Sequence, residues 1–288
     1  MIPVIDTQVY VQPINNDSLI ASKVSIWMAR FDLIHPIISG NKLYKLYYWL
    51  KQAVEENKQI ETFGGYFSNH LVAAAYACKV LDIPCTGYIN GERPNDLSHT
   101  MKHCEEYGMQ LKFLQRDIYK RKKYSYTTTD KDLITIPEGG FHPTGMKGAT
   151  LMRNAWGDSN YTHICVPVGS ATTLAGILYS GNEKIIAIPA IKNMTDIPQR
   201  LQYLYKDYNK ERLMVWPDFH FGGFAKSPPH LIKFIDDFFN QYHISLDKVY
   251  TAKMMAAIFQ KIETGWFKPG SKILCLHTGG LQGNGPAS

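Results

Sequence analysis

The sequence lacks the marks of membrane and secreted proteins. No stretch approaches the roughly 18 consecutive apolar residues that a membrane-spanning helix needs, and the first residues have neither the basic start nor the apolar run of a signal peptide. The chain is nevertheless 45% apolar and 12% aromatic over 288 residues, enough for one large domain or two smaller ones and too much for intrinsic disorder. We therefore expect a soluble, cytoplasmic protein with no membrane partner.

Charge and cysteine are also scarce. The 31 Lys and Arg against 25 Asp and Glu leave a net charge of only +6, and the densest basic run, residues 120–123, is short. Because a nucleic-acid interface gathers basic residues on one face, we expect this run to be solvated surface and predict no nucleic-acid partner. The five cysteines are far apart and lack C-x-x-C spacing. They predict buried thiols, with neither a disulfide framework nor a metal site.

Short apolar runs alternate with helical periodicity along the chain. The runs typical of buried strands cover residues 22–28, 60–63, 84–89, 163–168, 184–190 and 271–276. Such alternation indicates parallel-rich sheets with helices on both faces, that is, an α/β protein. Two segments fall outside the pattern: residues 119–132 are expected to be a surface excursion, and residues 137–148 a connection between units.

Two helices can be placed from their apolar spacing. One begins at Asn41, and its predicted apolar face comprises Leu43, Leu46, Tyr47, Leu50 and Val54. The other follows a Gly-Gly turn, with Ser68 as its N-cap. Its predicted buried side comprises Leu71, Val72, Ala75 and Cys78.

Four polar or glycine-bearing segments follow predicted strands or begin predicted helices, at residues 39–42, 64–70, 169–173 and 277–280. In open α/β sheets, ligands bind beyond the carboxyl ends of the strands. The four segments are therefore candidates to line one crevice.

Each segment taken singly has two interpretations. The run Gly169-Ser170-Ala171-Thr172-Thr173 between a strand and a helix is either a phosphate cradle or a tight turn, and it is neither a Walker loop nor a G-x-G-x-x-G fingerprint. Lys42 lies in the first turn of a helix, where the dipole disfavours a cation. It is either a surface lysine or one that carries an imine. His277 is, by itself, more typical of a hydrogen-bonded structural histidine than of a catalyst.

The segments are more specific in combination. Gly40-Asn41-Lys42, Gly64-Gly65, Ser68-Asn69-His70, the Gly169 loop, the run from Val249 to Lys253 and His277-Thr278-Gly279-Gly280 occur in this order. From about Arg30 to Asn284 the chain resembles the pyridoxal-phosphate enzymes of the aminocyclopropane-carboxylate deaminase and D-cysteine desulfhydrase family. These enzymes share the two-domain tryptophan-synthase-β-like fold, also called fold type II.

The resemblance implies a role for each motif residue. Lys42 would form the Schiff base with pyridoxal 5'-phosphate, Asn69 would bond the ring hydroxyl oxygen, and Thr251 would face the pyridine nitrogen. The loop from Gly169 to Thr173 would hold the phosphate. Ser68 and Tyr250 would assist catalysis, and the substrate contacts would come from Ser68, Asn69, His70, Tyr250 and Thr278.

The same resemblance bears on the substrate. The deaminase branch carries Glu at position 251 and Leu at position 278, where this chain has Thr251 and Thr278. A threonine cannot hold the ring nitrogen protonated by its own charge, so elimination of a good leaving group is favoured. Together with Ser68-Asn69-His70, these markers predict β-elimination of D-cysteine to pyruvate, sulfide and ammonia. The alternatives are aminocyclopropane-carboxylate deamination, another pyridoxal-phosphate lyase or β-replacing enzyme, and a non-catalytic cofactor-binding protein.

Some features depart from the family pattern. Tyr44 replaces an arginine, Lys45 is a second lysine one helical turn after Lys42, and no role follows for His142 or for residues 219–223. The resemblance implies a homodimer acting on a small amino acid. It also implies a discontinuous large domain, residues 1–52 and 152–288, and a small domain, residues 53–151.

Overall fold

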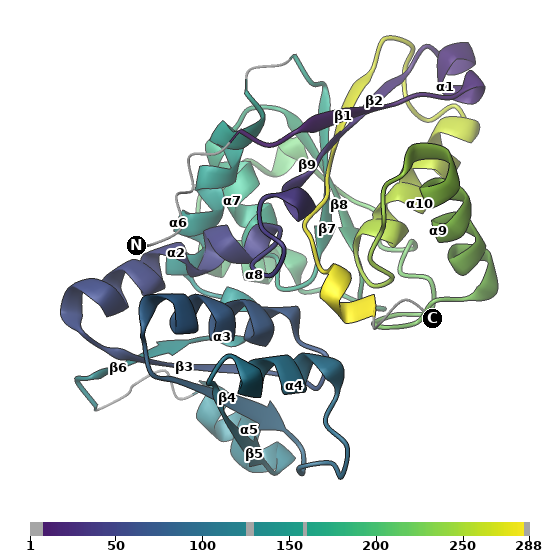
Figure 1. Ribbon diagram of the computed structural model, residues 1–288. Helices are drawn as coiled ribbons and strands as arrows, with labels where there is room; N and C mark the ends of the chain where they lie inside the picture. Colours follow the sequence, from purple (N-terminus) through teal and green to yellow (C-terminus); the bar gives the residue numbers. More distant parts are fainter. Residues whose placement is uncertain (1–7, 125–129, 158–159, 285–288) are drawn as a thin grey trace.

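The computed structural model describes residues 8–124, 130–157 and 160–284, and its strands form two sheets (Figure 1). The larger sheet has the order β1-β2-β10-β7-β8-β9, and only β1 runs antiparallel to its neighbour. Its strands are β1 (Val11–Ile14), β2 (Ser25–Ala29), β7 (His163–Val168), β8 (Lys184–Pro189), β9 (Leu213–Val215) and β10 (Lys272–Leu276).

The smaller sheet is parallel throughout, in the order β5-β4-β3-β6. Its strands are β3 (Gln59–Gly64), β4 (Cys85–Asn90), β5 (Gln110–Leu114) and β6 (Leu133–Ile136). All four lie within the segment predicted as the small domain, and Figure 1 shows this sheet with α3, α4 and α5 below the larger one. The parallel-rich α/β prediction is confirmed.

The connections between strands are mostly helical. The α-helices are α1 (Asp17–Ser22), α2 (Asn41–Glu56), α3 (Asn69–Leu81), α4 (His99–Glu106), α5 (Arg116–Tyr124), α6 (Pro143–Thr150), α7 (Thr172–Ser180), α8 (Ile197–Leu204), α9 (Pro229–Tyr242) and α10 (Thr251–Glu263). The short 3₁₀ turns are η1 (Phe31–Leu33), η2 (Glu138–Gly140), η3 (Leu151–Trp156), η4 (Lys210–Arg212) and η5 (Leu281–Asn284).

Helices cover both faces of the larger sheet. Along β7, the side chains of Ile164 and Val166 join the core beneath α2 and α7, whereas Cys165 between them joins the core beneath α9 and α10. This alternation follows from the two-residue period of a strand. Since both faces are buried, the strand is apolar throughout, which is why its sequence is easily recognised.

Small residues bring three helices into close contact. A Cβ on Gly148 of α6 would stand 2.1 Å from the backbone oxygen of Tyr44 in α2, and one on Gly176 of α7 would stand 2.6 Å from the Cβ of Ala149. No larger side chain fits at either glycine. Because α6 packs between α2 and α7, the starts of α2 and α7 are held in a defined position.

Most sequence expectations for the elements are confirmed, and three are wrong. Residues 137–148 contain η2 and most of α6 rather than a simple connection, because His142 caps a helix that Pro143 begins. Residues 116–124 form α5 and bury Tyr119, so the predicted excursion begins as packed helix; residues 125–129 lie outside the described part of the chain. Val54 is 46% exposed although its spacing places it on the apolar face of α2.

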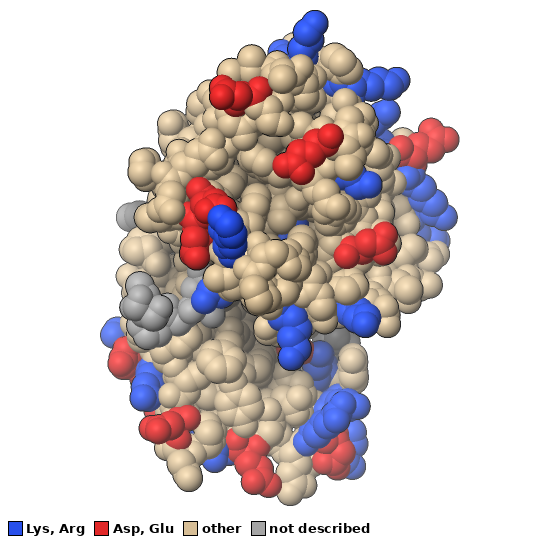
Figure 2. Space-filling model, turned by 90° about the vertical axis from the view of Figure 1, so that its right-hand side faces the viewer, with Lys and Arg blue, Asp and Glu red and all other residues tan. Residues whose placement is uncertain are grey.

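The cysteine and charge predictions have simple outcomes. All five cysteines are buried thiols. In the basic run, Lys122 pairs with Glu61 at 3.3 Å and Lys123 pairs with Glu138. On the face shown in Figure 2, basic and acidic side chains are interspersed. In the described ranges no helix is long and apolar enough to span a bilayer.

Candidate active site

Backbone and side-chain contacts bring together the four segments expected to line one crevice. The N–H of Asn41 donates to the Thr278 carbonyl at 3.3 Å, and the Asn41 amide donates to Thr173 Oγ1 at 2.8 Å. Asn69, from the segment that follows β3, donates to the Gly280 carbonyl at 3.2 Å. Segments from both sheets therefore meet at one place, as predicted.

Lys42 lies at the centre of this arrangement. It is the second residue of α2, which follows Gly40 at φ +68°, where a Cβ would stand only 1.9 Å from the Thr278 oxygen. The Lys42 amine is half-buried and donates to Asn41 Oδ1 at 2.6 Å. Burial lowers the pKa of Lys42 to about 8, against a raising effect from Asp247. Roughly a tenth of the amine is therefore neutral and nucleophilic at pH 7, compared with less than about a thousandth for an ordinary lysine.

The start of α7 has the features of an anion cradle. Ala171 adopts a left-handed conformation at φ +68°, and no side chain caps the helix. The hydroxyls of Ser170 and Thr172 lie 2.9 Å apart, and they also hydrogen-bond the carbonyls of Gly139 at 3.5 Å and Gly140 at 3.3 Å. The N–H groups of the first helical turn and two adaptable hydroxyls are therefore left for a ligand, which is the arrangement that binds phosphate.

The start of α3 presents polar groups from the smaller sheet. Ser68 Oγ accepts from the Leu71 N–H at 3.3 Å, which confirms its predicted capping role and leaves its own proton for a further acceptor. Asn69 Oδ1 is buried without a hydrogen-bond partner. Such an orphaned acceptor, on an amide that donates to the Gly280 carbonyl, indicates a missing donor at this place.

His70 occupies a different environment from its two neighbours. It is 3% exposed, and its Nε2 lies 2.9 Å from Thr62 Oγ1, whose own proton goes to the Ile136 carbonyl. Nε2 therefore carries the proton. Burial, followed by the charges of Lys45 and Lys42, lowers the pKa of His70 to about 3, so the ring is neutral. It supports the smaller sheet, and its predicted contact with substrate remains a prediction.

The segment before α10 contributes Tyr250 and Asp247, and it packs against the loop that begins at Gly169. The Tyr250 ring lies against Gly169, where a Cβ would stand 3.0 Å from Tyr250 Cε1. Burial and the charge of Asp247 raise the pKa of Tyr250, which keeps its hydroxyl protonated. Thr251 is fully buried and bonds the carboxylate of Asp247 at 2.6 Å. No signal in the sequence identifies Asp247, because it lies four positions before the helix, outside the N-cap and first-turn positions at which an acidic residue marks a helix start.

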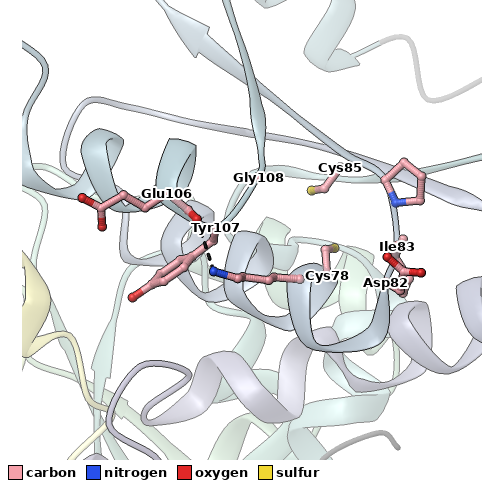
Figure 3. Close-up of a pocket in the computed structure, with 9 residues that line it drawn as sticks. Cys78, Asp82, Ile83, Cys85, Glu106, Tyr107 and Gly108 are labelled. Atoms are coloured by element: carbon pink, nitrogen blue, oxygen red, sulfur yellow. Dashed lines mark hydrogen bonds between the residues drawn. The ribbon is translucent and has the colours of Figure 1, made fainter.

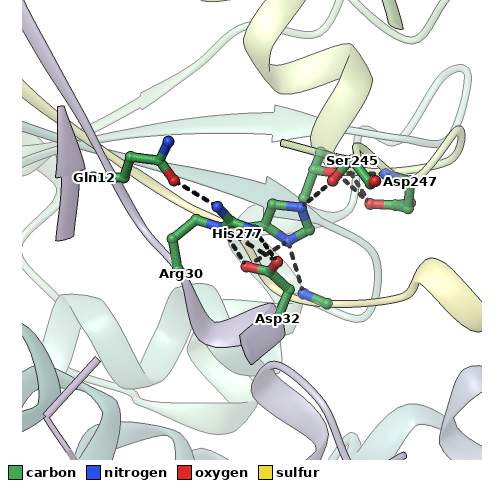
Figure 4. A network of polar contacts seen from close by, with 8 residues as sticks. Gln12, Arg30, Asp32, Ser245, Asp247 and His277 are labelled. Carbon is green, nitrogen blue, oxygen red and sulfur yellow. Dashed lines mark hydrogen bonds and ion pairs between the residues drawn. The ribbon is translucent and has the colours of Figure 1, made fainter. Parts of the chain in front are cut away.

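The histidine after β10 is structural, as its sequence context favours (Figure 4). His277 Nε2 lies 2.7 Å from the Ser245 carbonyl, so Nε2 carries the proton, and Nδ1 accepts from the Gly279 N–H at 3.3 Å. Asp32, 3.6 Å from Nδ1, is paired with Arg30 at 2.7 Å. This buried network fixes the Thr278-Gly279-Gly280 backbone against the segment that leads into Asp247.

The second lysine of α2 hydrogen-bonds the turn beside the start of α7. Lys45 is buried and donates to the Gly139 carbonyl at 2.6 Å, beside the Ser170 hydroxyl. Burial and the charge of Lys42 lower the pKa of Lys45. Lys45 thus supports the turn that faces the α7 cradle, a role that its sequence position alone did not indicate.

A separate hollow of about 350 Å³ lies at the other end of α3, where Cys78, Asp82 and Tyr107 are among the residues that line it (Figure 3). Lys79 and Asn69 are ten residues apart on this helix, a distance of about 15 Å. None of the predicted site residues lines the hollow.

The residues present fit a phosphorylated aldehyde cofactor. A lysine of lowered pKa, an uncapped helix start with two hydroxyls and an orphaned buried amide oxygen belong to segments that hydrogen bonds join. Together, the fold and these residues are typical of an α/β enzyme that uses a phosphorylated aldehyde cofactor.

Comparison with known proteins agrees. Residues 17–195 match the family described as pyridoxal-phosphate dependent enzyme, and the chain belongs to this family. A protein of Pyrococcus horikoshii, named provisionally as a 1-aminocyclopropane-1-carboxylate deaminase, is 27% identical over 280 residues, covering 90% of this chain and 85% of its own. The cofactor and the fold type II assignment are thereby confirmed.

Solved structures show the same fold. The crystal structure of an aminocyclopropane-carboxylate deaminase homologue superposes with a TM-score of 0.82 at 22% identity, covering 99% of this chain and 92% of the other. A hydrogen sulfide-producing enzyme from Fusobacterium nucleatum superposes with a TM-score of 0.68 at 11% identity, covering 98% of both chains.

Proposed function

We propose that the protein is a lyase that eliminates a β substituent from a small amino acid, with pyridoxal phosphate bound at Lys42. The main support is that Lys42, whose pKa is about 8, lies in a segment that is hydrogen-bonded to the uncapped start of α7. When bound, the cofactor supplies an electron sink for the substrate carbon that bears the amino group. The two sheets would then belong to two domains, residues 1–52 with 152–288 and residues 53–151, with the cleft between them.

The chain's own residues divide the remaining work. The hydroxyls of Ser170 and Thr172 and the first-turn N–H groups of α7 hold the phosphate, and Thr173 holds Asn41 in place. Asn41 orients the Lys42 amine, which then acts as a base beside the substrate Cα.

The substrate side of the cleft is formed by α3 and α10. The start of α3, with the hydroxyl of Ser68, receives the substrate carboxylate, because a helix N-terminus favours an anion. Tyr250 stays protonated and donates a hydrogen bond in the cleft. Retention of Lys42, Ser68 and Tyr250 together opposes a non-catalytic role.

The favoured substrate is D-cysteine, which with one water gives pyruvate, hydrogen sulfide and ammonia. Support comes from Thr278, a buried polar residue beside Gly40 where the deaminase branch carries leucine. The sulfide-producing neighbour shows that the same fold accommodates this product.

Aminocyclopropane carboxylate is the second candidate, because relatives of similar length carry that name. With one water it gives a four-carbon 2-oxo acid and ammonia. Both reactions release ammonia, so sulfide and the chain length of the oxo acid distinguish them.

The test is a side-by-side assay of purified protein loaded with pyridoxal phosphate. D-cysteine, L-cysteine and aminocyclopropane carboxylate are supplied separately, and sulfide and oxo acids are quantified. Sulfide from the D form alone is the expected result. Oxo acid from the cyclopropane without sulfide from D-cysteine would replace the first candidate by the second, and inertness toward all three would reject both.

A further inference from the structure

His142 caps α6, the helix packed between α2 and α7. Its Nδ1 accepts a hydrogen bond from the Thr144 N–H at 3.1 Å and lies 3.0 Å from Thr144 Oγ1. The backbone at His142 is extended, as at other N-caps, and Pro143 begins the helix. The ring is half-buried, with its centroid 5.9 Å from that of Trp49 in α2. An imidazole therefore does here what a serine or asparagine side chain usually does at a helix start.

This cap exists in one protonation state only. A neutral imidazole with its proton on Nε2 has a single lone pair on Nδ1, and the Thr144 N–H donates to it. Protonation places an N–H on Nδ1 as well. The Thr144 hydroxyl can rotate to accept that proton, but the Thr144 N–H then faces another N–H. The added charge also lies at the positive end of the helix dipole. Neutral His142 thus caps α6, and protonated His142 does not.

The turn just before His142 is bonded to the α7 cradle. The Gly140 carbonyl accepts from the His142 N–H at 2.9 Å and from the Thr172 hydroxyl at 3.3 Å. The carbonyl of the preceding residue accepts from the Ser170 hydroxyl at 3.5 Å and from Lys45 Nζ at 2.6 Å. Both cradle hydroxyls therefore bond to η2, the turn that leads directly into the cap.

The first turn of α6 is packed tightly against η2. A Cβ on Gly145 would stand 2.2 Å from the Gly140 oxygen and 3.1 Å from the Trp49 ring. Farther along the helix, Gly148 contacts the backbone of α2 and Ala149 contacts α7. Because close-packed contacts transmit displacements, a change at the start of α6 reaches η2 and both neighbouring helices.

The surroundings of His142 favour its neutral form. Burial lowers its pKa below the ordinary value of about 6.5. Every charged side chain on α6 and on α2, η2, η3 and α8, which pack against it, has a partner of its own, and α7 contains no charged residue. The pairs are Glu138 with Lys123, Lys42 with Asn41, Lys45 with the Gly139 carbonyl, Lys51 with Glu55, Glu56 with Lys58, Arg153 with Glu183, Arg200 with Asp196, and Lys147 with the Tyr48 ring. Since folding lowers this pKa, the stability that the cap contributes is complete above about pH 6.5 and is lost as the pH falls from there through the lowered value.

We propose that His142 is a pH-dependent positioning residue. In its neutral form it caps α6 and holds η2 against the hydroxyls of Ser170 and Thr172, and its protonation in acidic solution releases both. For the bound cofactor the inference rests on the proposed function, in which these hydroxyls hold the phosphate. Acidification then weakens the cradle, so the enzyme retains pyridoxal phosphate less well in acid than at neutral pH.

The first test compares three forms of the full-length protein without added ligand: unchanged, His142→Asn and His142→Ala. Asparagine supplies an N-cap acceptor that does not titrate, and alanine supplies none. Proton NMR of the histidine rings gives the titration midpoint of His142, identified as the signal that His142→Asn lacks. Amide hydrogen exchange of residues 138–150 is then measured at neutral pH and one pH unit below that midpoint, and the three forms are compared at the same pH.

At neutral pH we expect the unchanged protein and His142→Asn to exchange alike, and His142→Ala to exchange about 2- to 30-fold faster, the range for losing an N-cap. At the lower pH the unchanged protein should exchange as fast as His142→Ala, while His142→Asn stays protected. A merely structural histidine would give the same ratio of unchanged protein to His142→Asn at both pH values. That result, or a ring that stays neutral down to about pH 4.5, would overturn the proposal.

A second measurement separates this inference from the proposed function. The dissociation constant of pyridoxal phosphate is measured for the unchanged protein and for His142→Asn at the same two pH values, and the ratio of the two constants cancels the titration of the phosphate and of Lys42. The ratio should be near 1 at neutral pH and rise about 2- to 30-fold at the lower pH. Exchange that depends on pH while this ratio stays constant would uphold the role of His142 at η2 and reject the α7 cradle as the phosphate site. Exchange that does not depend on pH in a protein that binds the cofactor would overturn the role of His142 and leave the proposed function standing.

Discussion

The helices α7 and α10 begin at the same cleft but treat their exposed N–H groups differently. At α7 no side chain caps the helix, and Ala171 adopts a left-handed turn that leaves the first-turn N–H groups open. At α10 the carboxylate of Asp247 accepts three N–H groups and is buried beneath them. Both ends favour an anion. One end is left for the anion of a ligand, and the other holds an anion of the chain itself.

The anion held at the start of α10 affects the pKa of Lys42. Its amine lies where burial disfavours charge, and the pKa falls to about 8, while Asp247 opposes the fall. Lys42 must be a neutral amine to attack an aldehyde. Its pKa is therefore set by two opposing effects, desolvation, which lowers it, and the buried carboxylate of Asp247, which raises it. Four predictions test this comparison.

The largest effect is expected from removing the amine. Lys42→Ala should abolish the visible absorbance of the bound cofactor and all lyase activity, because it removes the amine proposed to bind the cofactor. Absorbance spectra after loading check this, with Lys51→Ala, an exposed lysine of the same helix, as the control. Visible absorbance that persists in Lys42→Ala but disappears in Lys45→Ala would move the anchor by one helical turn.

A second change makes α7 resemble α10. Ser170→Asp places a carboxylate at the open helix start, where it competes with the cofactor phosphate for the same N–H groups. We expect pyridoxal phosphate to bind about 10- to 100-fold more weakly, equivalent to losing a hydrogen bond to a charged group, about 1.5–3 kcal/mol. Affinity for pyridoxal, which has no phosphate, should not change. Ser170→Asn is the matched neutral control, and an equal loss for both ligands would argue against the cradle.

A third change gives positions 278 and 251 the residues of the deaminase branch. Thr278→Leu removes a buried hydroxyl from the cleft and should lower sulfide release from D-cysteine about tenfold, or about 1.4 kcal/mol in the barrier. Adding Thr251→Glu places a second carboxylate beside Asp247 and should lower it further by repulsion. Initial rates of sulfide release measure both steps. If the double variant is as fast as the unchanged protein, these positions do not set the reaction.

The smallest effect is a shift in pH dependence. Because the lysine amine attacks only when neutral, the rate of cofactor loading should rise with pH, reach half its maximum near pH 8, the pKa of Lys42, and level off above it. Asp247→Asn removes a charge that raises this pKa, so the midpoint should move down by about 1 unit. Stopped-flow absorbance over a pH series measures it. A midpoint near the ordinary lysine value of about 10.4 would show that a different, solvated amine is titrating.

Much of the fold and of the site was accessible from sequence alone. The strand β7 was predicted with its observed bounds because burial on both faces makes it apolar throughout, and Ser68 was predicted as a cap from the chemistry of one helix start. Both signals are local, since they depend on spacing within a few residues. The cofactor was implied instead by the family that the order of motifs from Gly40 to Gly280 resembles.

What the tertiary structure decided depends on segments that are distant in the chain. Gly148 of α6 meets the backbone of α2 only because folding brings residues 137–148 against that helix, a contact that no local pattern contains. Lys45 acquires its role from the Gly139 carbonyl, 94 positions away. The chemistry of a side chain in a cleft depends on which donors and charges the fold brings to it.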